Sequence, residues 1–204
     1  NLEDYVRTDK SRIDRQTALG LRARAYLYME EWALAASDAA AASKGYVPAS
    51  MNEVSEPSFY DISEHNWIWG YDMTTDIAMK NPYATSSAWI RSFSGDGYSA
   101  GTQVYSCINN LLYEKIPSTD VRKGWWVDDS PLLESVTWDG VSGNAVAALE
   151  IDNVKMKFLP YTNVKFGMYS VGGTLNDEDW PLMRVEEMIL IQAEGLARSG
   201  AEAQ

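Results

Sequence analysis

The sequence predicts a mainly α-helical protein, built from tetratricopeptide-like helical hairpins with long aromatic-rich loops and a few short strands. Two observations predict this class. Apolar residues recur at helical spacing near both ends, at 14–45 and 181–199, and the middle of the chain has little helical period. With 204 residues, 46% of them hydrophobic, the chain can bury a core. We expect residues 1–204 to be part of a single domain.

A helical hairpin is predicted over residues 14–45. The apolar stripe of its first helix recurs at i, i+4, i+7 and i+8, at Leu19, Ala23, Tyr26 and Leu27. The second helix opens at Trp32 and ends before Gly45, with a narrow seam at Ala35, Ala39 and Ala42. Small alanines allow close approach of the two helices, as in a tetratricopeptide hairpin.

A repeat helix is predicted over residues 181–199. The acidic run 177–179 precedes Pro181, and both features favour a helix N-terminus. We expect its apolar stripe to be Leu182, Val185, Ile189, Ala193 and Leu196. Because this helix has no partner in the sequence to cover its apolar face, we expect the chain to be a fragment whose next element lies beyond Gln204 or on another chain.

The middle of the chain divides into three parts. Residues 59–102 are an aromatic-rich loop region, since nine of the forty residues 59–98 are aromatic against 24 of 204 overall. Residues 103–128 are predicted to hold a helix from about Gln103 to Lys115, followed by a turn capped by Thr119 or Asp120. Residues 130–176 are read as irregular connections and short strands, with a strand near 154–158.

Charge and composition exclude several classes of function. The formal net charge is −12, so a nucleic-acid or anionic membrane-surface partner is not expected. The motifs of zinc proteases, P-loops and dinucleotide-binding turns are not found, and we predict no metal and no cofactor. The chain has one histidine and one cysteine, and the sequence around neither of them suggests a catalytic role. We expect His65 to lie at the edge of a strand and Cys107 to pack as a small hydrophobe.

Four segments together resemble the SusD/RagB family. They are the helical hairpin TALGLRARAYLY at 17–28 followed by WALAA at 32–36, the helix and turn LLYEKIPSTDVR at 112–122, the strand NVKF at 163–166, and the helix WPLMRVEEMILIQAE at 180–194. Their order and spacing agree with the family across nearly the whole chain. Each segment alone is a weak signal, because alanine-rich hairpins are common.

The resemblance implies a lipoprotein of the outer membrane, exposed at the cell surface. Such a protein would bind an oligosaccharide and deliver it to a SusC-like TonB-dependent transporter, without catalysis. It would be attached to the membrane only through a lipid anchor that lies outside this chain.

Sugar binding requires exposed aromatic rings for stacking and polar groups that fix the orientation of the hydroxyls. The irregular segment 81–98 offers Tyr83, Trp89 and Tyr98 as a stacking platform, with Arg91, Asp96 and Gln103 as polar groups nearby. The aromatic residues of 67–71 are expected in the core, because they alternate as in a half-buried strand. A second possible platform is the Trp125–Trp126 pair together with Trp138, where we expect Trp125 to be packed.

Four charged residues match family motifs but are expected to be structural, pairing or capping within the hairpins: Asp120, Arg122, Arg184 and Glu194. Two other functions stay open. The chain can be a tetratricopeptide-like scaffold that binds a protein or peptide partner, in which case aromatic residues should line a helical groove. A glycoside hydrolase would need two carboxylates facing one sugar, and no motif supports such a pair.

Overall fold

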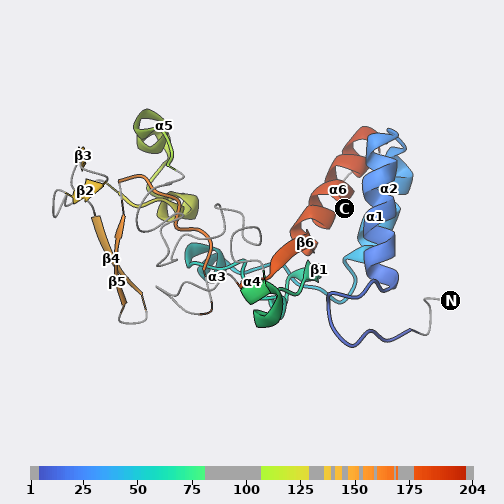
Figure 1. Cartoon of the computed structure of the whole chain (residues 1–204). Helices are drawn as coiled ribbons and strands as arrows, with labels where there is room; N and C mark the ends of the chain where they lie inside the picture. The colour runs from blue at the N-terminus through green and yellow to red at the C-terminus, as the bar shows by residue number, and fades with distance from the viewer. Residues whose placement is uncertain are drawn as a thin grey trace. The chain divides into compact units, whose positions relative to one another are not determined.

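The computed structural model describes residues 5–80, 107–128, 136–138, 141–143, 147–151, 154–158, 160–167, 169 and 177–200. In this part of the chain most residues with regular structure are helical, and the strands are short (Figure 1). The prediction of a mainly α-helical fold is confirmed. The chain forms two compact units, described separately below. The described residues of 5–49, 62–72 and 179–200 form the first unit, and those of 50–61 and 73–178 form the second.

The predicted hairpin opens the first unit as two antiparallel helices (Figure 1). Helix α1 spans Arg15–Tyr28 and helix α2 spans Trp32–Ala42. Helix α1 begins where it does because the Asp14 carboxylate accepts the backbone N–H of Thr17 at 2.8 Å, which satisfies one of the free donors of the first turn. The alanine seam of α2 is fully buried, as predicted from its spacing: Ala35, Ala39 and Ala42.

A bidentate ion pair also joins the two helices of the hairpin. Arg22 of α1 donates to the two carboxylate oxygens of Asp38 in α2, at 2.5 and 2.9 Å. These hydrogen bonds and the charge of Asp38 raise the pKa of Arg22 above its usual value. Arg22 itself is largely exposed, so this pair mainly sets the alignment of the helices and adds little stability.

Helix α6, Val185–Arg198, packs against the alanine face of α2, and Figure 1 shows α1, α2 and α6 side by side. Gly195 of α6 makes the closest approach. A Cβ atom at this position would lie 2.6 Å from the carbonyl oxygen of Trp32 and 2.9 Å from the Cβ atom of Ala36. The two helices can therefore approach this closely only because position 195 has no side chain.

The predicted start of this last helix is wrong. Residues Trp180–Arg184 form strand β6, which pairs antiparallel with strand β1, Trp67–Tyr71, and α6 begins only at Val185. The acidic residues and Pro181 suited a helix N-terminus by local rules. The ladder with β1, which is more than a hundred residues away in the sequence, overrides that local preference.

The predicted apolar stripe of α6 is rotated from the observed one. The buried residues of this helix are Val185, Met188, Ile191 and Gly195. Ile189 was expected in the core, but 39% of its surface is exposed, and Ala193 is exposed as well. A helix with apolar residues at 188–191 offers two possible stripes, and its contact with α2 selects one of them.

The aromatic residues of β1 are only partly in the core. Trp67 is fully buried and Trp69 is half-buried, while 41% of Tyr71 is exposed. Ile68 is also fully buried, so β1 does not alternate as a simple half-buried strand. The irregular register with β6 between Trp67 and Gly70 explains this pattern, because it breaks the two-residue period.

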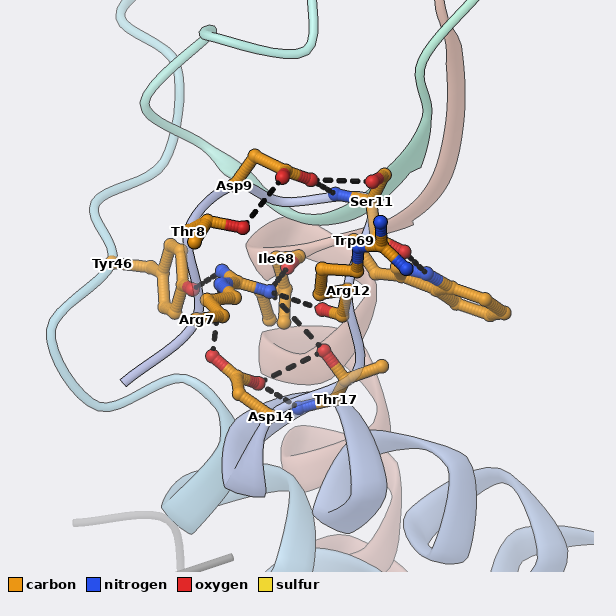
Figure 2. Close-up of polar contacts among 10 residues, drawn as sticks. All are labelled: Arg7, Thr8, Asp9, Ser11, Arg12, Asp14, Thr17, Tyr46, Ile68 and Trp69. Atoms are coloured by element: carbon orange, nitrogen blue, oxygen red, sulfur yellow. Dashed lines mark hydrogen bonds and ion pairs between the residues drawn. The ribbon is translucent and has the colours of Figure 1, made fainter. Parts of the chain in front are cut away.

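A buried arginine joins four segments of the first unit (Figure 2). Arg7 pairs with Asp14 at 3.0 Å and donates to the carbonyl oxygen of Ile68 at 2.7 Å and to the hydroxyl of Tyr46. Only 11% of the Arg7 side chain is exposed. Burial raises the pKa of Tyr46, and the charge of Arg7 opposes that rise. Arg7 therefore ties the N-terminal segment to α1, to the loop after α2 and to β1.

The described part of the second unit contains short elements only. Its helices are α3 (Met51–Ser55), α4 (Thr75–Lys80), α5 (Asn110–Lys115) and the 3₁₀ turn η1 (Val121–Trp125). Its strands form two antiparallel ribbons, β2 (Val136–Trp138) with β3 (Val141–Gly143), and β4 (Ala147–Ile151) with β5 (Val154–Phe158). The strand expected near 154–158 is confirmed as β5, and α4 is a helix that the sequence did not predict.

The helix predicted from Gln103 to Lys115 is shorter in the described part of the chain. Helix α5 begins at Asn110, and residues 107–109 are not helical. Leu111 and Leu112 of this helix are 63% and 55% exposed. Cys107 is exposed and pairs with Thr162 in a β-bridge, so the expectation that it packs as a small hydrophobe is wrong.

Candidate functional site

The first predicted platform and its polar groups lie outside the described residues. Tyr83, Trp89, Arg91, Asp96 and Tyr98 all belong to 81–106, as does Gln103. The backbone of Trp138 is part of β2, and its side chain is likewise outside the description. These assignments stay predictions, and the geometry below concerns other residues.

Three short segments pair side by side in the second unit. Residues 161–164 lie between 125–127 on one side and 107–108 on the other. The backbone N–H groups of Val127 and Val164 donate to the carbonyl oxygens of Thr162 and Trp125 at 2.9 and 2.8 Å, and Ile108 N–H donates to Tyr161 at 3.0 Å. We call these residues the three-segment ribbon.

The central segment of the three-segment ribbon separates a packed face from an accessible one. Thr162, Val164 and Phe166 are buried, whereas Asn163 and Lys165 between them are half-buried. Successive residues of an extended segment point to opposite faces. Asn163 therefore lies on the side away from Thr162 and Val164.

Trp126 lies directly opposite Asn163 in this ribbon. The hydrogen bonds from Val127 and Val164 flank the pair, so Trp126 and Asn163 do not bond to each other through their backbones. In an antiparallel ladder, this kind of pair brings the opposed side chains closest, on the same face. An indole ring and a side-chain amide are thus neighbours on one half-buried surface.

The neighbouring ring, Trp125, is packed. Its indole N–H donates to the carbonyl oxygen of Val54 at 2.6 Å, and the ammonium group of Lys165 lies 4.4 Å from its ring centre. The same ammonium group lies 4.6 and 5.1 Å from the rings of Phe59 and Phe166. Cation–π contacts of this kind hold the segment 125–127 against the segment 163–166.

Tyr161 adds a strained position next to this surface. Its φ angle is +68°, which is unusual for a bulky residue, and its backbone N–H donates to Val127 at 2.7 Å. Its ring lies 5.2 Å from that of Tyr113, which the Lys123 ammonium group faces at 4.9 Å. A strained backbone persists only where its surroundings hold it, and such positions cluster at functional sites.

The first unit contains a groove between α1 and α6. Its volume is about 620 Å³, and its wall residues include Arg24, Tyr28, Glu187, Leu190 and Ile191. Tyr28 and Leu190 are 89% and 69% exposed. Arg24 and Glu187 form a bidentate pair across the groove, with both distances at 2.6 Å. Tyr28 is the one aromatic residue among the described residues that line it.

The four charged residues that match family motifs all lie in local pairs. Arg122 holds Asp120 through both carboxylate oxygens, and Asp120 also accepts the backbone N–H of Arg122 and so caps η1. Hydrogen bonds from Arg122 lower the pKa of Asp120 to about 2. Arg184 lies 3.8 Å from Glu186, and Glu194 pairs with Arg198 at 2.7 Å. These contacts agree with a structural role.

Comparison with solved structures identifies the fold. A SusD-like carbohydrate binding protein from Bacteroides vulgatus aligns over 97% of this chain, with a TM-score of 0.63 and 22% identity. The chain has the SusD-like fold. A SusD superfamily protein from Bacteroides thetaiotaomicron aligns over the same share, with a TM-score of 0.59 and 17% identity. This SusD-like chain spans 36% and 40% of the lengths of these two proteins.

Sequence comparisons add nothing to this fold assignment, since no family model and no curated protein matches the chain. The described residues contain no helix long and apolar enough to cross a membrane. Within the same residues, no group of three or more His, Cys, Asp or Glu side chains is arranged to hold a metal ion.

Sequence reasoning did not single out Asn163, Tyr161 or Lys165 as members of a site. The alternation of 162–166 was visible in the sequence, because small and apolar residues at 162, 164 and 166 flank polar ones at 163 and 165. The pairing of this segment with Trp126 was not, because it joins residues 37 positions apart.

Proposed function

We propose that this chain is part of a cell-surface protein that binds an oligosaccharide and delivers it to a SusC-like TonB-dependent transporter of the outer membrane, without catalysis. The observation that carries the proposal is the SusD-like fold, together with a neighbour of this fold that is described as carbohydrate binding. The wealth of aromatic and amide side chains outside the long helices supports it.

The stacking platform of this proposal is Tyr83, Trp89 and Tyr98, with Arg91 and Asp96 orienting the sugar hydroxyls. The first test is binding of the purified chain to an array of oligosaccharides, followed by calorimetric titration with each hit. Replacing Trp89 with Ala should weaken binding about tenfold, which corresponds to about 1.4 kcal/mol, and leave the melting temperature nearly unchanged.

Tyr5→Ala is the matched control, because Tyr5 is an exposed aromatic residue of the first unit and does not line the groove between α1 and α6. Its affinity for the sugar should equal that of the unchanged chain. Unchanged affinity of Trp89→Ala together with a large fall in melting temperature would show that Trp89 is a core residue, and the platform would then be abandoned.

Absence of catalysis and delivery to a transporter need separate tests. The bound oligosaccharide should be recovered intact after long incubation with the chain, and a product that disappears on replacing one carboxylate would refute the non-catalytic part of the proposal. The full-length protein should co-purify from outer membranes with a TonB-dependent transporter, and repeated purification without such a transporter would refute delivery.

One observation favours a second function, the binding of a peptide segment. The groove between α1 and α6 is open and lined by Leu27, Tyr28, Leu190 and Ile191. A peptide-displaying phage library is a suitable test, with Leu190→Glu as the variant that should abolish any selected binder. Binders that tolerate Leu190→Glu would show that the groove is not their site.

A further inference from the structure

The paired side chains of Trp126 and Asn163 form a candidate binding surface that is separate from the platform predicted at Tyr83, Trp89 and Tyr98. They belong to the second unit and come from two segments of the three-segment ribbon that meet only through tertiary pairing. The packed contacts of this ribbon come from other residues, namely Trp125, Lys165 and Thr162.

Both side chains have hydrogen-bond donors without a partner among the described residues. The Asn163 side-chain oxygen accepts the backbone N–H of Lys165 at 2.9 Å, and this bond fixes the orientation of the amide. In the described part of the chain, no hydrogen bond involves the Asn163 amide nitrogen or the Trp126 indole nitrogen, and neither nitrogen is buried without a partner. Both nitrogens therefore reach solvent.

The surface that presents these groups is rigid. Backbone hydrogen bonds of 2.8 and 2.9 Å flank the pair on both sides. Lys165 holds the adjoining Trp125 by a cation–π contact, and Tyr161, two residues before Asn163, keeps a left-handed φ of +68°. A preformed arrangement loses little conformational entropy when a ligand binds, which favours a binding role.

We propose that Trp126 and Asn163 form a subsite for one neutral pyranose ring of an oligosaccharide. The inference rests on the proposed sugar-binding function and assigns to it a place outside the platform of Tyr83, Trp89 and Tyr98. It takes Trp126 from the second possible platform and pairs it with Asn163. The apolar C–H face of the sugar stacks on the Trp126 ring, and the Asn163 amide donates to a ring or hydroxyl oxygen at the edge of the same sugar.

The chemistry of the pair selects the class of ligand. An indole and an amide have no charge, so they satisfy hydroxyl groups without requiring a counter-charge. The chain carries a net charge of −12, and the nearby Lys165 ammonium group is held against the rings of Trp125, Phe59 and Phe166, so the overall charge disfavours an acidic sugar. The subsite is therefore one for neutral sugars such as hexoses or pentoses in pyranose form.

The test uses the whole chain and a panel of neutral manno-, gluco-, xylo- and galacto-oligosaccharides, with polygalacturonate fragments as the acidic comparison. Calorimetric titration compares the unchanged chain with Trp126→Ala, Asn163→Ala and the control Leu112→Ala. Leu112 is 55% exposed on α5 of the same unit and belongs to none of the segments of the three-segment ribbon. We expect both subsite variants to weaken the best neutral ligand about tenfold, and Leu112→Ala to leave its affinity unchanged.

A second measurement is independent of the folding of the variants. In the unchanged chain labelled with ¹⁵N, the Trp126 indole N–H resonance, assigned with Trp126→Phe, should shift saturably as the neutral ligand is added. A ligand that binds while this resonance stays in place overturns the subsite. So does equal affinity of Trp126→Ala and the unchanged chain.

The outcomes separate the two proposals. Loss of affinity in Trp89→Ala with none in Trp126→Ala leaves the proposed function standing and removes the subsite. If no member of the panel and no array sugar binds the unchanged chain, sugar binding by this chain fails, and the subsite fails with it. Preference for the acidic fragments would overturn the assignment to neutral sugars alone.

Discussion

Replacing Arg7 with Ala is the sharpest test of how the first unit is held together. Arg7 is the one side chain that contacts Asp14, Tyr46 and Ile68 at the same time in Figure 2. Truncation removes the cation and leaves the Asp14 carboxylate, which is only 12% exposed, without its ion-pair partner. It also removes the donor to the buried carbonyl oxygen of Ile68.

The size of the effect follows from what remains. Breaking a buried ion pair by removing one partner costs about 3–5 kcal/mol. Asp14 keeps two hydrogen bonds, from the backbone N–H and the hydroxyl of Thr17 at 2.8 and 3.0 Å, so the lower end of that range applies. We expect the free energy of unfolding to fall by about 3 kcal/mol, equivalent to about 6–12 °C in melting temperature for a chain of this size.

Denaturant titration and thermal melts of the variants measure this change. Arg15→Ala is the matched control, because Arg15 is exposed at the start of the same helix and its loss removes the same charge without breaking a contact in the described residues. Arg7→Lys should fall between the two, because lysine keeps the charge but lacks the planar fork of donors. Equal stability of Arg7→Ala and Arg15→Ala would refute the reasoning.

Three further predictions concern packing and pH. Met188→Ala should lower the free energy of unfolding by about 2–5 kcal/mol in denaturant titration, because Met188 is fully buried. Ile189→Ala should lower it much less, because Ile189 is 39% exposed. The apolar stripe expected from the sequence predicts the reverse order of the two variants. Gly195→Ala should lower the free energy of unfolding by about 1–3 kcal/mol in the same assay, because the added Cβ atom would meet the backbone of Trp32. An unchanged free energy of unfolding would contradict the close contact between α6 and α2 at this position. By NMR titration, Asp120 should show a pKa of about 2, returning toward the ordinary value of 3.8 in Arg122→Ala. Because the folded pKa is depressed, this pair stabilises the fold above about pH 4 and its contribution is lost as pH falls toward 2, so an unshifted Asp120 would contradict the pairing.

The sequence by itself determined the helical elements at both ends of the chain. The alanine seam of α2 and the stripe of α1 lie where their spacing places them, because a helical period of 3.6 residues is a local property. The capped turn at Asp120 was also readable, since a capping carboxylate acts on the next few residues only. The SusD-like class followed from the order of four such local signals.

Tertiary structure decided everything that depends on pairing between distant residues. The ladder with β1 turned 180–184 into a strand, and contact with α2 chose which face of α6 is buried. The same holds for the candidate subsite, where Trp126 and Asn163 become neighbours only through the bridge between their segments. Local helix and strand propensities differ by about 1 kcal/mol or less per residue, so a ladder of hydrogen bonds or a packed helix face outweighs them. The pattern within one segment does not show which distant segment will pair with it or pack against it.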